Sequence, residues 1–140
     1  MDTKFGFGKM VDLGFEEAVD TVTEELGKEG FGVLTEIDVQ ATLKTKLDVD
    51  SRPYRILGAC NPQLAHRAMS GEPFIGVLLP CNVVVMEREG GGSIVAALKP
   101  TAAFTLSWTS ISTWPRDNFW GSSVRTGRGR PLFFAPPSAT

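Results

Sequence analysis

The sequence predicts an α+β protein in which an antiparallel sheet carries helices on one face. Three observations support this class: apolar and polar residues alternate in several short segments, one longer segment has apolar residues at helical spacing, and a glycine-rich turn separates two alternating segments. The expected order of elements is β-α-β-(α)-β-α-β-β. At 140 residues with 42% hydrophobic content, the chain is long enough for one domain with a single core.

The first expected elements are a strand, a long helix and a second strand. Two phenylalanines lie two positions apart within residues 4–11, as in a strand with one buried face. From Phe15 the apolar residues follow helical spacing, acidic residues occupy the other side, and Gly30 is the expected stop. The members of this apolar stripe are Phe15, Ala18, Val19, Val22 and Leu26. Alternation over residues 31–39 predicts the second strand.

Strands and helices continue to alternate after the second strand. Residues 40–50 fit either a short helix or a crossing without regular structure, and residues 54–60 predict the third strand. Asn61 and Pro62 have the chemistry of a helix start, because an Asn side chain can accept from a free backbone N–H and proline lacks the donor that would stay unpaired there. This short helix is expected to end at Gly71.

The last two expected strands, residues 81–89 and 94–100, form a hairpin across the glycine turn. A sheet of this size needs more cover than one long and two short helices provide, so a further amphipathic helix is expected after them. Residues 101–140 do not show it, since they are rich in Ser, Thr and Trp and are interrupted by Pro115. We therefore divide the chain into an α+β domain at 1–100 and an atypical tail.

Charge and composition narrow the possible partners. The formal net charge of −2 removes the usual attraction for nucleic acid or an anionic membrane, so neither is expected as a partner. The sequence contains no apolar run that could span a bilayer, and its first residues do not resemble a signal peptide. Two cysteines are too few for a disulfide framework, and no motif indicates a cofactor. A cytoplasmic protein with reduced thiols is expected.

Three blocks of sequence carry a resemblance to a known family. They are Thr35-Glu36-Ile37-Asp38, then Gly58-Ala59-Cys60-Asn61-Pro62 with Ala65-His66, and Leu79-Pro80-Cys81-Asn82-Val83-Val84-Val85. Over residues 4–100 the chain resembles the bacterial and archaeal family called domain of unknown function 302. The resemblance implies a compact α+β fold with a layout like that of the TATA-binding protein, a homodimer, and no established activity.

The resemblance also implies a charged amphipathic helix after residue 100, and there the sequence departs from the family. Arginine, proline, serine and tryptophan replace lysine and glutamate in this segment. One hypothesis is that the chain from about residue 105 onward is translated out of frame, since a shifted reading of GC-rich DNA tends to give this composition. The alternative is a native tail whose aromatic and arginine side chains form a contact surface. Both alternatives predict an irregular tail, and resequencing the gene distinguishes them.

The stretch ILGACNPQLAHRA brings a cysteine, an asparagine and the one histidine of the chain close together in sequence. Cys60 ends the third expected strand and Cys81 begins the fourth. If these strands are antiparallel neighbours, both thiols lie at one end of the sheet. Asn61 and Asn82 follow the two cysteines, and His66 lies about one turn into the next helix. The sequence therefore predicts a rim that gathers thiols, amides and an imidazole.

Several chemical interpretations of this rim stay open. Cys60, Cys81 and His66 form a ligand set that zinc accepts, although their spacing is not a known motif. Cys60 just before a helix start could be a nucleophile with His66 as its base, or the two thiols could form a redox pair. Free cysteine is also common as a buried apolar residue, in which case Asn61 is only a helix cap.

Two functions follow from these interpretations. The first is a dimeric binding module that holds a small anionic ligand at the rim, through Asn61, Cys81, Asn82 and the free N–H groups of the helix start. The second is a thiol-dependent enzyme or redox protein with Cys60 as its active group and His66 as base. A structural protein that works by pairing with itself or a partner is a third possibility.

Overall fold

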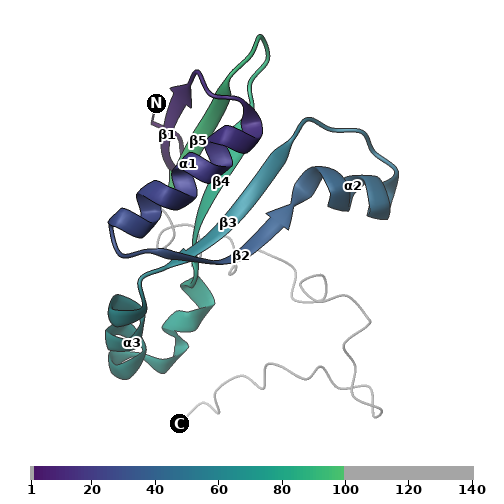
Figure 1. Ribbon diagram of the computed structural model, residues 1–140. Helices are drawn as coiled ribbons and strands as arrows, with labels where there is room; N and C mark the ends of the chain where they lie inside the picture. Colours follow the sequence, from purple (N-terminus) through teal and green to yellow (C-terminus); the bar gives the residue numbers. More distant parts are fainter. Residues whose placement is uncertain (1, 100–140) are drawn as a thin grey trace, which may run out of the picture. The chain divides into compact units, whose positions relative to one another are not determined.

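The computed structural model describes residues 2–99, which lie within the compact unit Met1–Ala103 (Figure 1). The elements in chain order are β1 (Gly6–Val11), α1 (Phe15–Lys28), β2 (Gly32–Asp38), α2 (Val39–Leu47), β3 (Tyr54–Cys60), α3 (Pro62–Gly71), the 3-10 helix η1 (Pro73–Leu78), β4 (Cys81–Glu87) and β5 (Ser93–Leu98). This order confirms the one expected from the sequence and adds η1. The expected tail falls outside the described residues.

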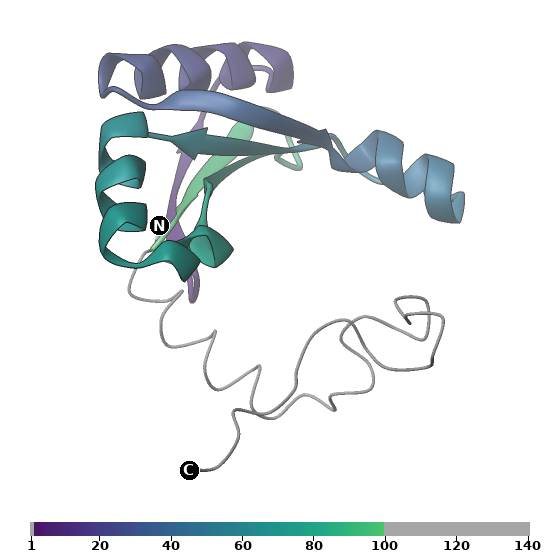
Figure 2. The same cartoon turned by 90° about the horizontal axis from the view of Figure 1, so that it is seen from below.

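The strands of the described residues form one open sheet in the order β1-β5-β4-β3-β2, and all neighbouring pairs are antiparallel. The β4–β5 hairpin turns through Gly90, Gly91 and Gly92, which all have positive φ angles that other residues rarely adopt. Helix α1 lies along one face of the sheet (Figure 2). The α+β class with an antiparallel sheet is therefore confirmed.

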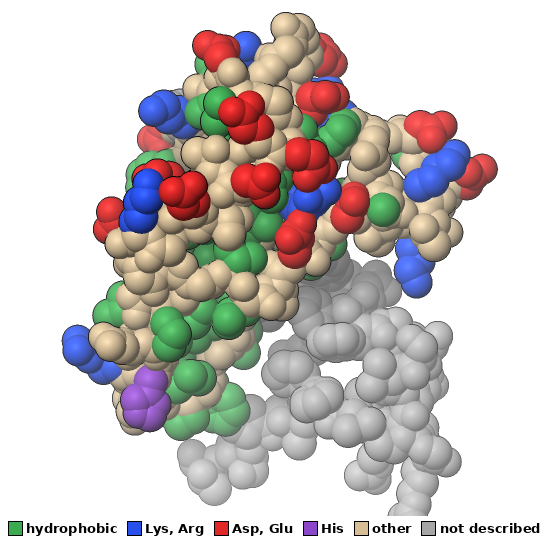
Figure 3. Space-filling model, viewed as in Figure 1, with side chains coloured by type: hydrophobic (Ala, Val, Ile, Leu, Met, Phe, Trp, Pro, Cys, Tyr) green, Lys and Arg blue, Asp and Glu red, His purple; other side chains and the backbone are tan. Residues whose placement is uncertain are grey.

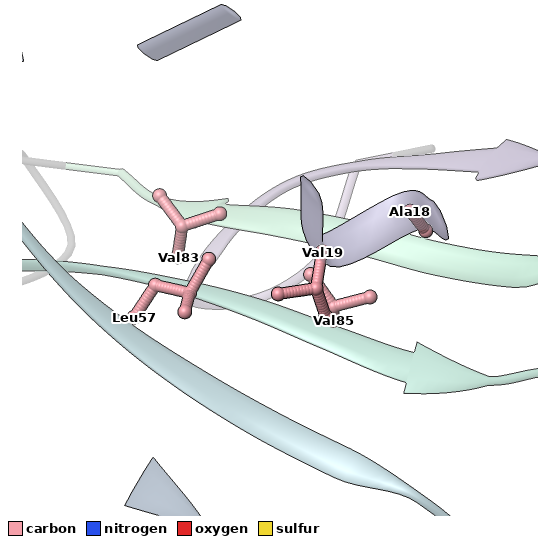
Figure 4. Packing of buried hydrophobic residues seen from close by; sticks show 5 residues of the cluster. All are labelled: Ala18, Val19, Leu57, Val83 and Val85. Carbon is pink, nitrogen blue, oxygen red and sulfur yellow. The ribbon is translucent and has the colours of Figure 1, made fainter. Parts of the chain in front are cut away.

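Helix α1 buries the predicted apolar stripe against the middle of the sheet. Ala18 and Val19 are buried and contact a cluster that contains Leu57 of β3 and Val83 and Val85 of β4 (Figure 4). The other members of the stripe pack around this cluster. The helix stops as expected, because the chain reverses at Gly30 with φ +83° and the Phe31 N–H donates to the Leu26 carbonyl over 2.9 Å.

The strand register assigns every side chain to one of two faces, since directly paired residues point to the same side of a sheet. Leu57 and Val83 are paired and both face α1. We call the opposite face the second face. Its residues are Gly6, Gly8 and Met10 (β1), Thr35 and Ile37 (β2), Tyr54, Ile56, Gly58 and Cys60 (β3), Asn82, Val84 and Met86 (β4), and Ile94, Ala96 and Leu98 (β5). Among these described residues, none carries a charge and no side chain is fully buried.

Arg55 ties the beginning of α1 to the sheet on the α1 face. Its guanidinium lies 2.9 Å from Glu36, 3.2 Å from Glu16 and 3.7 Å from Asp38. The guanidinium also stacks 5.1 Å from the centre of the Phe15 ring. Burial lowers the pKa of Arg55, whereas the hydrogen bond with Glu16 and the surrounding carboxylates raise it. The carboxylates have the larger combined effect, so the pKa is raised above its ordinary value. One cation thus joins α1, β2 and β3.

Replacing Arg55 by glutamine is expected to lower the free energy of unfolding by about 2 kcal/mol, because three carboxylates lose their common partner. Arg52→Gln is the matched control, since the Arg52–Glu89 ion pair is exposed at both ends and its loss costs less than about 0.5 kcal/mol. Urea denaturation followed by circular dichroism measures both variants. Equal losses in the two variants would show that the Arg55 network contributes nothing particular to the fold.

Candidate functional site

The ends of β3 and β4 that carry the cysteines lie side by side, as the sequence predicted. The two strands are antiparallel neighbours, with Ala59 paired to Cys81 and Gly58 paired to Asn82. Both thiols therefore lie at the same end of the sheet, and both are free and partly exposed.

The register nevertheless separates the two sulfur atoms. Cys81 shares a face with its partner Ala59, which is the α1 face, whereas Cys60 is one residue further along β3 and belongs to the second face. Side chains that leave a sheet in opposite directions cannot form a disulfide or share a metal without movement of the backbone. Within residues 2–99, no three His, Cys, Asp or Glu side chains are arranged to hold a metal ion.

Asn61 caps α3 as predicted. Its Oδ1 accepts a hydrogen bond of 3.2 Å from the Leu64 N–H, and Pro62 occupies the first turn. Its Nδ2 lies against the turn that joins α1 to β2, only 3.2 Å from where a Cβ on Gly30 would stand. Asn61 thereby holds the start of α3 against that turn.

His66 is exposed on α3, one position after Ala65, which is the buried residue of that helix. Its ring lies at the surface, among the apolar side chains at the α3 end of the molecule (Figure 3). The backbone carbonyl of His66 accepts from the Ser70 hydroxyl at 2.8 Å. Within residues 2–99, the His66 imidazole forms no hydrogen bond with either thiol.

The three sequence blocks that carry the family resemblance meet on the second face, around Gly58. Thr35 of β2 and Asn82 of β4 are the direct partners of Gly58 on its two sides. A Cβ at Gly58 would overlap the Thr35 hydroxyl and stand 2.8 Å from Cγ of Pro80. Only glycine therefore fits between them. We call Thr35, Gly58, Cys60, Pro80 and Asn82 the Gly58 cluster.

The Gly58 cluster presents polar groups without internal partners. Among the described residues, neither the Thr35 hydroxyl nor the side-chain amide of Asn82 takes part in a hydrogen bond, and both residues are exposed. Sequence reasoning selected Cys60 and Asn82 but missed Thr35. The available signal was the isolated glycine in the middle of a central strand, which marks a close approach by a neighbouring group.

Other candidate positions have ordinary roles. Glu36 and Asp38, which belong to the first family block, both bind Arg55. Two hollows among the described residues lie beside α2, away from the rim. The first is lined by Glu36, Ile37, Asp38, Ala41, Thr42, Thr45 and Lys46, and the second by Gln40, Ala41, Lys44, Val49, Asp50 and Ser51.

Gly58→Ala is expected to destabilise the protein by about 1 to 3 kcal/mol, because the added methyl forces Thr35 and Pro80 apart. Adding Thr35→Ala should recover part of the loss, since it removes the hydroxyl nearest to the new methyl. Gly27→Ala in α1 is the control: it meets no atom within 4 Å and should be neutral or stabilising by up to about 1 kcal/mol. Thermal unfolding compares the stability of the variants. A Gly58→Ala variant as stable as the wild-type protein would contradict the steric argument.

Comparison with known proteins identifies the family. The sequence model of "Domain of unknown function DUF302" matches residues 7–110. The fold resembles the solved structure of an uncharacterised conserved DUF302 protein from Bacillus stearothermophilus, at 33% sequence identity and a TM-score of 0.66, covering 77% of this chain and 82% of that one. No curated protein matches, and none of the helices between residues 2 and 99 is long and apolar enough to cross a membrane. The chain therefore belongs to the DUF302 family, whose function is unknown.

Proposed function

We propose that this protein is a small dimeric binding module of the cytoplasm, which holds a small anionic ligand at the Gly58 cluster and the adjoining start of α3. The observation that carries the proposal is the pair of unpartnered polar side chains, Thr35 and Asn82, on either side of a position that cannot carry a side chain. Polar groups on an otherwise apolar surface are typical of sites that orient a ligand.

The donors available at the cluster favour an anion. The Thr35 hydroxyl and the Asn82 amide can both donate, and the second face contributes no carboxylate that would repel negative charge. Helix α3 begins at Pro62, two residues after Cys60, and its first turn offers the positive end of the helix dipole. Asn61 supports this arrangement by fixing the start of α3. Cys81 has no contact role in the proposal because it faces α1.

The ligand site is tested by titrating the ¹⁵N-labelled full chain with inorganic phosphate and following amide shifts. Saturable changes are expected at Gly58 and Asn82. Asn82→Ala and Thr35→Val should each weaken phosphate binding about tenfold, because each variant removes one hydrogen bond to a charged ligand. The control Thr45→Val changes an exposed threonine of α2, outside the Gly58 cluster, and should leave the affinity for phosphate unchanged. Absence of saturable shifts, or shifts confined to other elements, would refute a phosphate-like ligand at this cluster.

A thiol-dependent activity is the second candidate, because Cys60 is partly exposed and immediately precedes the α3 cap. It requires His66 to act as base, and His66 lies exposed on α3. The zinc and redox-pair interpretations need the two sulfur atoms on one side of the sheet, which the register does not provide.

Alkylation with iodoacetamide near neutral pH distinguishes the binding module from the thiol enzyme. In the binding module, Cys60 and Cys81 should both react no faster than free cysteine, measured separately in Cys81→Ser and Cys60→Ser variants. A Cys60 that reacts much faster, and slows when His66 is replaced by glutamine, would support the enzyme instead.

A further inference from the structure

We draw no further inference here: the strongest candidate, the exposed apolar side chains Leu64, Met69, Phe74 and Val77 on the surface of α3 and η1, carries no proposal because nothing in the part of the chain that the structure describes shows what covers them.

Discussion

The register between β3 and β4 is the constraint on which the other features of this structure depend. Pairing Leu57 with Val83 turns the apolar residues of the central strands toward α1 and creates the core. The same register sets Gly58 against Asn82 and sends Cys60 and Cys81 to opposite faces. A shift of one residue would exchange the two faces along the whole strand, so the buried cluster strongly determines the register.

The division into two faces also explains how the family blocks relate to one another. Alternate residues of one block serve different purposes: Glu36 and Asp38 bind Arg55 on the α1 face, while Thr35 and Ile37 belong to the second face. Around Gly58 the requirement is steric, since the Thr35 hydroxyl and the Pro80 ring fill the space of the missing side chain. The cluster thus combines a packing requirement with polar groups that face outward.

Much of the fold could be predicted from the sequence, because strong local patterns determine it. The stripe from Phe15 to Leu26, the Asn61–Pro62 helix start and the glycine hairpin each depend on neighbouring residues alone. The short helix at residues 40–50 was left open and is present as α2. The 3-10 helix Pro73–Leu78 was not predicted, since six apolar and small residues show no helical period.

The candidate site was only partly predictable, because its geometry depends on non-local pairing. The sequence correctly predicted that the cysteine-bearing ends of β3 and β4 are adjacent. It could not predict the strand register, which is offset by one residue and places the two thiols on opposite faces. It also could not show that Thr35 lies over Gly58, because a register shift between Val33 and Thr35 changes which side chains of β2 face α1.

The most direct test of the account is the pattern of interstrand proton contacts between β3 and β4, measured by NOE spectroscopy on the labelled full chain. The account predicts contacts that join Ala59 to Cys81 and Gly58 to Asn82. Contacts that instead join Cys60 directly to Cys81 would put both thiols on one face, and would contradict the division of the sheet on which the candidate site rests.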